Sequence, residues 1–283
     1  MRLQIGARLF EGAGPFLMGV VNATPDSFSD GGRSFALDAA VAHAERLARE
    51  GADLVDLGGE STRPGAAPVG AEEERRRVVP VIERLRARGF PVPISVDTRT
   101  GSVARAALEA GADLVNDVSG LADPALAAAV AAAGVPVVVM HMRGTPADMA
   151  GRAGYADLLA EVAAELRQGL ARAVAAGIGE DRVILDPGLG FAKTPAQTVT
   201  LLARIGELKA LGRPLLVGPS RKRFIGELTG APVEARLPGT LAAVTACVLA
   251  GVEFVRVHEV AAARQAALVA AALRKAGGKA ALG

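Results

Sequence analysis

The sequence contains one cysteine, one tyrosine and no tryptophan, and each scarcity narrows the class of protein. A single cysteine, Cys247, cannot form a disulfide within the chain, which excludes a disulfide-stapled scaffold and favours a reducing compartment. Cys247 lies in the apolar run LAAVTACVLAG, where a small buried hydrophobe is a better interpretation than a nucleophile. Because aromatic residues make up only 3% of the chain, we expect a core of Ala, Val and Leu, as in packed helices and buried parallel strands.

The sequence also lacks long apolar runs and a surplus of charge. No stretch without helix breakers reaches about 18 uncharged apolar residues, so we predict no membrane span. The first residues, MRLQIGARLF, lack the apolar segment of a secretory signal. The 32 basic and 30 acidic residues give a net charge of only +2 and form no basic stripe, which argues against a nucleic-acid partner. We therefore expect a cytoplasmic protein with small-molecule partners.

What the sequence does contain is a series of short aliphatic runs, each followed by a helix-like segment. The helical segments carry apolar residues at three- and four-residue spacing, as in 37–50, 72–88 and 156–176. Within the second of these, EEERRR (72–77) predicts a solvated helix face with i,i+4 ion pairs. The aliphatic runs predict eight strands: Phe16–Val21, Asp53–Leu57, Pro93–Val96, Asp113–Val115, Val135–Met140, Arg182–Leu185, Pro214–Val217 and Phe254–Val257.

Strands that alternate with helices indicate a parallel sheet. Glycine recurs where a helix would end and the next strand begin, as in EGAD, EAGAD, AAGV and AGVEF, and glycine accepts the left-handed conformation found there. Eight units in this length favour a single (β/α)8 TIM barrel spanning residues 1–283, with an open doubly wound sheet as the alternative. Long loops at 22–32 and 58–66 follow the first two strands and resemble ligand-binding loops in composition.

Polar residues stand where the predicted strands end. An Asp, Asn or Ser in such a position is about as well explained as a cap of the next helix. A Lys, Arg or His is not explained in this way, because its side chain offers no usual N-cap acceptor. Arg63, in the second loop, suits the binding of an anion. In a barrel all carboxyl ends lie on one face, where catalytic side chains are carried. The sequence therefore predicts a polar ring there, made of Asn22, Asp97, Asn116, Asp186, Lys222, Arg256 and His258.

Several of these segments are similar to those of a known family. MGVVNATPDSFSDGG, GGESTRPGA, ISVDTR, NDVSG, DPGLGF, GPSRKRFIG and RVHEV resemble, in order, the motifs of dihydropteroate synthases over roughly residues 16–260. The resemblance implies the condensation of 6-hydroxymethyl-7,8-dihydropterin pyrophosphate with p-aminobenzoate, which gives 7,8-dihydropteroate and pyrophosphate in folate synthesis. It also implies a Mg²⁺ ion, a barrel fold, a homodimer and a target for sulfonamides.

The resemblance assigns a task to each matching residue. Asn22 would bind the metal, and it belongs with the pyrophosphate-binding positions Asn22, Thr62, Arg63, Arg256 and His258. The pterin-binding positions are Asp97, Asn116, Met140, Asp186 and Lys222, although a core role for Met140 is an equal alternative. The p-aminobenzoate-binding positions are Thr62, Pro64, Gly190, Phe191, Lys222 and Arg223.

Asp97 and Lys222 are the residues that the resemblance implies for catalysis. We expect a dissociative reaction in which pyrophosphate leaves first, Asp97 stabilises the pterin cation and Lys222 hydrogen-bonds the ring. Arg223 departs from the common pattern, because many members of the family carry serine there. It puts the detail of the arylamine pocket and the response to sulfonamides in question. His141, at a strand end, has no role that the sequence explains.

Two alternatives share part of this pattern. A methyltransferase that moves a methyl group from methyltetrahydrofolate to a corrinoid protein would use the Asp and Asn residues of the pterin pocket. It would have no use for the STR loop, the SRK segment or the RVH ending. A synthase-like paralogue that binds pterins without this activity would have lost ring or loop residues, and the only change is the arginine at 223.

Overall fold

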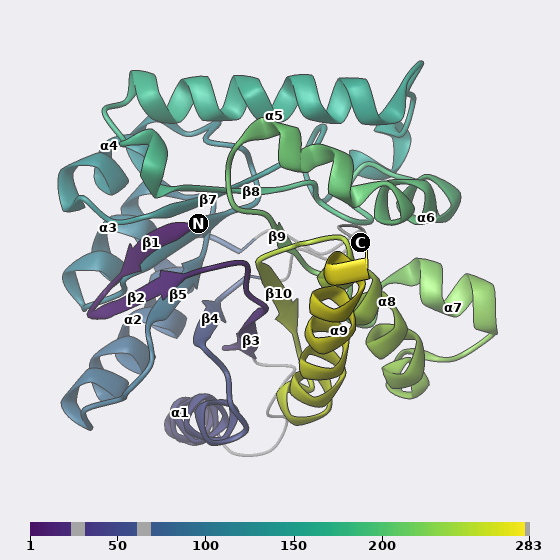
Figure 1. Ribbon diagram of the computed structural model, residues 1–283. Helices are drawn as coiled ribbons and strands as arrows, with labels where there is room; N and C mark the ends of the chain where they lie inside the picture. Colours follow the sequence, from purple (N-terminus) through teal and green to yellow (C-terminus); the bar gives the residue numbers. More distant parts are fainter. Residues whose placement is uncertain (24–31, 61–68, 281–283) are drawn as a thin grey trace.

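Eight parallel strands close into a barrel in the computed structural model, which describes residues 1–23, 32–60 and 69–280 (Figure 1). Neighbouring strands follow the order β8-β7-β6-β5-β4-β3-β10-β9, and a parallel bridge between Leu185 and Leu215 joins the two ends of that series. The barrel strands are β3 (Phe16–Asn22), β4 (Leu54–Gly58), β5 (Ile94–Asp97), β6 (Leu114–Asp117), β7 (Val137–Met140), β8 (Val183–Asp186), β9 (Leu216–Val217) and β10 (Phe254–Val257). All eight predicted strands are present, and the closed barrel replaces the open-sheet alternative.

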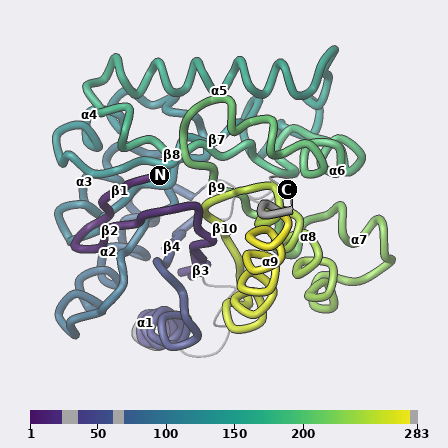
Figure 2. The backbone as a smooth tube through the Cα atoms, in the orientation of Figure 1, coloured from purple at the N-terminus to yellow at the C-terminus, as the bar shows by residue number. Residues whose placement is uncertain are grey.

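Helices cover the outside of the barrel and connect one strand to the next (Figures 1 and 2). The α-helices are α1 (Gly32–Arg49), α2 (Ala71–Ala87), α3 (Gly101–Glu109), α4 (Pro124–Ala133), α5 (Leu158–Ala175), α6 (Pro195–Ala203), α7 (Arg223–Thr229), α8 (Leu237–Leu249) and α9 (Val260–Ala280). Short 3-10 helices are η2 (Met149–Arg152), η3 (Glu180–Arg182), η4 (Ile205–Leu211) and η5 (Val233–Ala235). The expected glycine stops are confirmed, for example at Gly134, which ends α4 with a φ of 65°.

The helices lie close to their predicted places. The segment 156–176 corresponds to α5, and 72–88 corresponds to α2 with a shift of one residue at each end. The predicted ion pairs of α2 are present, with Arg77 Nε 3.0 Å from Glu73 Oε1. The prediction for α1 was wrong at its start, since that helix begins at Gly32 and so shortens the first long loop.

The inside of the barrel is apolar at its amino end. One buried cluster collects the first inward-facing residue of most strands: Met18, Leu54, Leu114, Val138, Ile184, Leu216 and Phe254. The remaining core packs the outer faces of the strands against the helices. Since side chains alternate across a strand, the residue two places later points into the barrel again, nearer its carboxyl end. That rule places Asp56, Asn116, Met140, Asp186 and Arg256 above the apolar cluster.

An antiparallel hairpin that was not predicted from the sequence closes the amino end of the barrel. It consists of β1 (Arg2–Ile5) and β2 (Arg8–Glu11), and it crosses in front of the barrel strands in Figure 1. Leu3, Ile5 and Phe10 are buried against the apolar cluster. The Phe10 ring meets Phe16 edge-on, with the ring centroids 5.0 Å apart. The hairpin therefore seals the end of the barrel that carries no predicted site residue.

Two further expectations are supported by the structure. Cys247 is fully buried in α8, and burial raises the pKa of its thiol to about 12, as expected of a core residue rather than a nucleophile. Among the helices in the described part of the chain, none is long and apolar enough to cross a membrane.

Candidate active site

The carboxyl ends of the barrel strands surround a cavity of about 470 Å³. Thr62, Arg63 and Pro64, which the sequence assigns to the substrates, lie outside the described residues. Every other predicted site residue lines this cavity: Asn22, Asp97, Asn116, Met140, Asp186, Gly190, Phe191, Lys222, Arg223, Arg256 and His258. The topology of the barrel thus brings together residues that are up to 236 positions apart in the chain.

Asp97 and Arg256 form the centre of the site. Arg256 donates through Nη2 to Asp97 Oδ2 at 2.8 Å and through Nε to Asp56 Oδ2 at 2.6 Å. Asn116 Nδ2 donates to the same oxygen of Asp56 at 2.9 Å. Asp97 Oδ1 is buried and has no hydrogen-bond partner among the described residues, so it can accept a bond from a ligand. Burial raises the pKa of Asp97 to about 7, opposed by Arg256 and reinforced by Asp56.

Asp186 and Lys222 face one another across the cavity wall from β8 and from the segment before α7. Asp186 Oδ1 accepts a hydrogen bond from the backbone N–H of Gly188 at 2.7 Å. Burial raises the pKa of Asp186 to about 6, although Gly188 and Lys222 act against the rise. Burial also lowers the pKa of Lys222 to about 8, with Asp186 opposing the fall. The pair therefore supplies one hydrogen-bond acceptor, Asp186, and one donor, Lys222. The pKa of each group lies near neutral pH.

His258 and Ser220 form a second polar group beside Arg256. The Ser220 hydroxyl accepts from the backbone N–H of His258 at 3.3 Å and lies 2.9 Å from His258 Nδ1. In the tautomer with the ring proton on Nε2, the hydroxyl donates to Nδ1 while its oxygen accepts from the backbone. In that tautomer the histidine offers an N–H to an anion. The sequence alone assigned Ser220 no role, although Ser220 lies within GPSRKRFIG, one of the segments that resemble the family's motifs.

Gly190, Phe191 and Arg223 lie toward the mouth of the cavity. The Lys222 ammonium lies 4.2 Å from the centre of the Phe191 ring, within the range of a cation–π contact. The Arg223 side chain is 77% exposed, and its Nε donates to Glu227 Oε1 at 2.7 Å along α7. The charged group of Arg223 is thus already paired with a carboxylate on the surface.

Arg221 and Arg236 also line the cavity, and both shape the loop before α7. The sequence alone assigned neither of them a role. Arg221 has a φ of 57°, and its guanidinium forms an ion pair with Glu259 at the start of the last connection. Its backbone N–H donates to Thr240 Oγ1 at 3.0 Å, and Arg236 Nη1 donates to its carbonyl at 3.1 Å. Only the folded chain brings these partners together, because they lie 15 to 38 residues away from Arg221.

Comparisons with known proteins place this chain in a family. The model of the pterin binding enzyme family matches residues 18–258. The dihydropteroate synthase of Synechocystis is 44% identical over 274 residues, which cover 96% of this chain and 94% of that protein. The chain belongs to the dihydropteroate synthase family. Its alignment spans the whole predicted polar ring, from Asn22 to His258.

Solved structures of dihydropteroate synthases have the same fold as this chain. The Yersinia pestis enzyme, in a complex with a sulfonamide drug, has a TM-score of 0.91 and 42% identity, and the match covers 98% of this chain and all of that one. The Xanthomonas albilineans enzyme, in complex with 7,8-dihydropteroate, has a TM-score of 0.87 and 46% identity, with 97% and 99% covered. These findings identify the chain as a transferase and decide against the methyltransferase alternative.

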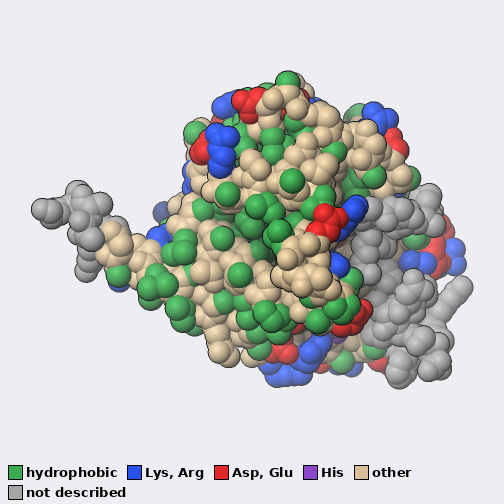
Figure 3. All heavy atoms as spheres, turned by 90° about the vertical axis from the view of Figure 1, so that its right-hand side faces the viewer, with side chains coloured by type: hydrophobic (Ala, Val, Ile, Leu, Met, Phe, Trp, Pro, Cys, Tyr) green, Lys and Arg blue, Asp and Glu red, His purple; other side chains and the backbone are tan. Residues whose placement is uncertain are grey.

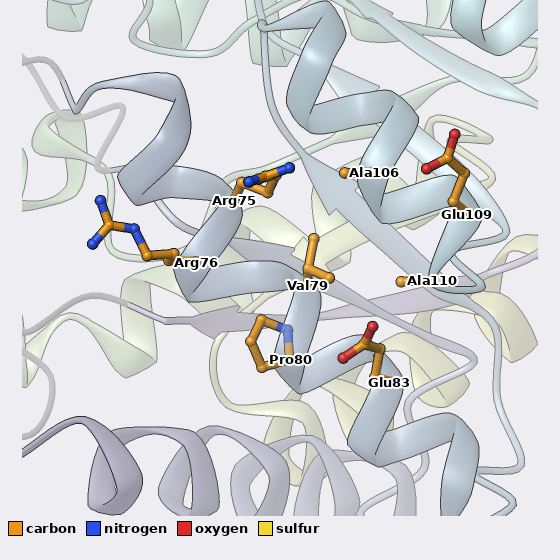
Figure 4. Close-up of a pocket in the computed structure, with 8 residues that line it drawn as sticks. All are labelled: Arg75, Arg76, Val79, Pro80, Glu83, Ala106, Glu109 and Ala110. Atoms are coloured by element: carbon orange, nitrogen blue, oxygen red, sulfur yellow. The ribbon is translucent and has the colours of Figure 1, made fainter.

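A second hollow, of about 380 Å³, lies on the outer surface between α2 and α3 (Figure 4). Its charged side chains are Arg75, Arg76, Glu83 and Glu109. Arg75 Nη2 lies 2.9 Å from Glu72 Oε2 on its own helix, so that guanidinium already has a partner. The hollow shares no residue with the cavity inside the barrel end, and we assign it no part in the family's chemistry.

Proposed function

We propose that the chain condenses 6-hydroxymethyl-7,8-dihydropterin pyrophosphate with p-aminobenzoate at the carboxyl-end cavity, forming 7,8-dihydropteroate and pyrophosphate. The observation that carries the proposal is that one cavity, in a chain of this family, gathers every described residue assigned to the pterin, the pyrophosphate and the arylamine. Folate synthesis is the pathway in which such an enzyme works.

The buried end of the cavity would hold the pterin ring. Its amino-pyrimidinone edge has adjacent donors and acceptors, and Asp97 Oδ1, Asp186 and Asn116 present carboxylate and amide groups to match them. Met140 is 4% exposed at the end of β7 and would lie against the face of the ring, where a polarizable thioether packs well. Lys222 would donate to the ring from the opposite wall.

The pyrophosphate would lie between Arg256 and His258. Arg256 carries a positive charge in every accessible state, and the Nε2–H of His258 adds a donor. Both would stabilise the negative charge that develops on the leaving oxygen as the C–O bond breaks. Thr62 and Arg63 belong to the same proposed anion-binding group.

Asn22 would hold a Mg²⁺ ion beside the pyrophosphate. It lines the cavity with an amide oxygen, and no cluster of three or more His, Cys, Asp or Glu that could hold a metal occurs in the described residues. This sparse donor set fits Mg²⁺, which keeps several waters and takes phosphate oxygens as ligands. When bound, the ion would neutralise charge on the pyrophosphate.

We favour a dissociative sequence of steps. The C–O bond to pyrophosphate breaks first, and the dihydropterin ring delocalises the resulting methylene cation. Asp97 and Asp186 stabilise the cation electrostatically inside a buried site, where such interactions are stronger than in water. The amino nitrogen of p-aminobenzoate then attacks the methylene carbon, forms the C–N bond and releases its extra proton to solvent.

The arylamine would enter past Gly190, Phe191 and Lys222, with its carboxylate toward Arg223. Thr62 and Pro64 are assigned to the same pocket. Arg223 can exchange its ion pair with Glu227 for one with the benzoate, and an arginine can bind a carboxylate through two parallel N–H bonds. A sulfonamide analogue, which lacks the carboxylate, would gain less from Arg223 than p-aminobenzoate does.

We also propose that the enzyme works as a homodimer in the cytoplasm. The outer faces of α8 and α9 expose large apolar side chains, with Leu249, Leu268, Val269 and Leu273 each at least 45% exposed. Figure 3, which views the molecule from the right of Figure 1, shows hydrophobic side chains gathered on this side. Burial of such a face is favourable and is typical of an interface between copies. A single buried thiol suits a reducing compartment.

The activity is tested with the purified chain, Mg²⁺, the pterin pyrophosphate and p-aminobenzoate. We expect release of pyrophosphate and a product with the mass of 7,8-dihydropteroate, and no product when either substrate is omitted. Absence of dihydropteroate with all components present would overturn the proposal.

A further inference from the structure

A buried lysine that no step above uses lies in the wall of the cavity, beside the proposed arylamine pocket. Lys193 follows the segment DPGLGF and is only 7% exposed. Its ammonium donates to the carbonyl of Gly188 at 3.1 Å and to that of Phe191 at 3.0 Å, and it lies 2.8 Å from His141 Nδ1. An ammonium has three protons, so these three acceptors satisfy it completely.

His141 connects Lys193 to helix α5. A charged Lys193 can only donate, so Nδ1 of His141, which faces it, then accepts, and the ring proton stands on Nε2, 3.0 Å from Glu165 Oε2. Burial and the nearby Lys193 lower the pKa of His141 to about 3, which keeps the ring neutral at physiological pH. The histidine therefore acts as an acceptor for Lys193, with the Glu165 carboxylate near its other ring nitrogen.

A second arm reaches the same loop from Glu165. Arg143 forms an ion pair with Glu165, and its guanidinium lies 4.0 Å from the centre of the Tyr155 ring. The Tyr155 hydroxyl donates to the carbonyl of Ala192 at 3.0 Å. Lys193 and Tyr155 together bind three of the five carbonyls between residues 188 and 192.

That loop carries the surface on which the arylamine would lie. Gly190 has a φ of 77°, and a Cβ added there would be in ordinary van der Waals contact with Lys222, 3.6 Å from its Cδ. The Phe191 ring lies under the Lys222 ammonium. A shift of the loop would therefore displace Phe191 and Lys222 together, whereas Asp97 and Asn116 on β5 and β6 would keep their places.

We propose that Lys193, with His141 as its third acceptor, is a positioning residue that fixes the loop 188–192 in the geometry that binds p-aminobenzoate. This inference rests on the proposed synthase activity. The contacts of Lys193 are with the backbone of Gly188 and Phe191 and with His141, so the lysine, which lies in the cavity wall, acts on the arylamine through the loop.

Lys193→Met tests the proposal, because methionine has a similar length and cannot donate. We expect the KM for p-aminobenzoate to rise on the order of 10- to 100-fold, since small misplacements of a binding group have effects of this size. We expect kcat to fall far less, and the Kd of the pterin pyrophosphate alone, measured by calorimetry, to stay within about threefold of the wild-type value.

Two matched sets of variants separate positioning from general destabilisation. Lys209→Met removes another lysine that is paired with a buried carboxylate, Glu253, at the amino end of the barrel; it should lower the Tm without changing the KM. His141→Asn keeps an acceptor atom at the position of Nδ1 and should retain most of the affinity, whereas His141→Leu should raise the KM as Lys193→Met does.

The proposal fails if Lys193→Met or His141→Leu keeps the wild-type KM for p-aminobenzoate. It also fails if pterin affinity falls as much as arylamine affinity, or if Lys209→Met raises the KM to the same extent. These outcomes differ from failure of the proposed function, because in that case the wild-type chain itself would make no dihydropteroate.

Discussion

The two ends of the barrel use the same strands for opposite purposes. At the amino end, Leu54, Leu114, Ile184 and Phe254 fill the interior, and the hairpin β1–β2 covers them. Buried charges there have partners: Asp53 binds Arg8, Arg264 and the backbone N–H of Leu17, and Glu253 binds Lys209.

At the carboxyl end, two residues further along the same strands, carboxylates and cations replace the aliphatic side chains. Asp56 is fully buried, yet its Oδ1 has no hydrogen-bond partner among the described residues, and neither has Oδ1 of Asp97. A buried polar atom without a partner is unfavourable for folding, so this end is less stable than it could be. The contrast shows that stabilising contacts are concentrated at the amino end of the barrel, whereas the capacity to bind ligands is concentrated at the carboxyl end.

The largest effect that this contrast predicts is on turnover. Asp97→Asn keeps the size of the side chain but removes the charge that stabilises the pterin cation. We expect kcat to fall on the order of 100- to 1000-fold, as when one preorganised electrostatic group is lost, with a much smaller change in the Kd of the pterin pyrophosphate. Steady-state kinetics and calorimetry on one preparation provide both numbers.

A control for Asp97→Asn lies two residues earlier on the same strand. Ser95 is fully buried, and its hydroxyl has no hydrogen-bond partner among the described residues. Ser95→Ala should leave both kcat and affinity near wild type. Equal losses of turnover and pterin affinity in Asp97→Asn would count against this catalytic role.

At the amino end the largest effect should be on stability. Phe10 is 1% exposed and packs against Phe16 and Phe254, so Phe10→Ala should lower the free energy of unfolding by about 3–5 kcal/mol. Leu9→Ala, on the same strand but 40% exposed, should change it by less than about 1 kcal/mol. Chemical denaturation measures both. A KM that changes in Phe10→Ala at temperatures where it stays folded would contradict the separation of the two ends.

The pH dependence of stability sharpens the comparison further. Burial raises the pKa of Asp97 from 3.8 to about 7, so between these values the folded state binds this proton more tightly than the unfolded state. The contribution of Asp97 to the free energy of unfolding therefore falls as pH rises from about 4 to 7, and Asp186 acts in the same direction up to about 6. Asp97→Asn should gain stability relative to wild type at pH 8 but not at pH 4. A difference between the two proteins that is the same at both pH values would refute this.

The barrel could be predicted because its signals are local. Each aliphatic run is followed by a polar residue such as Asp97 or Asp186, and the period of two residues along a strand is enough to place that residue inside the barrel end. The hairpin β1–β2 also has a local signal, the alternation in RLQI and RLFE around a two-residue turn, but each strand is only four residues long.

The partners of the site residues could not be predicted in this way. Arg256 bonds Asp56, which lies 200 residues earlier, and that contact depends on the closure of the barrel. The sequence alone gives no reason to expect a buried Lys193, because lysine is rarely buried without acceptors, and here only the fold supplies them. The three acceptors of Lys193 come from its own loop and from His141, the residue after β7, and this explains why no motif points to it.

The smallest expected effect lies at the exposed rim of the carboxyl-end cavity. Arg223 and Glu227 form an exposed i,i+4 pair, and such pairs contribute about 0.2–1 kcal/mol at most. Arg223→Ser should therefore leave the Tm almost unchanged. It should raise the KM for p-aminobenzoate by about two- to fivefold, the same range of energy expressed as affinity, because the benzoate would lose one exposed cation.

Glu227→Gln is the matched counterpart, because it removes the carboxylate that competes with the substrate for Arg223. Its KM for p-aminobenzoate should fall, and the inhibition constant of a sulfonamide, which has no carboxylate, should move less than that KM. If both variants shift the KM in the same direction, the two side chains do not compete in the way that the geometry indicates. If neither shifts it, Arg223 belongs to the solvated surface of α7, and the specificity of the pocket lies deeper, at Lys222 and the loop that Lys193 holds.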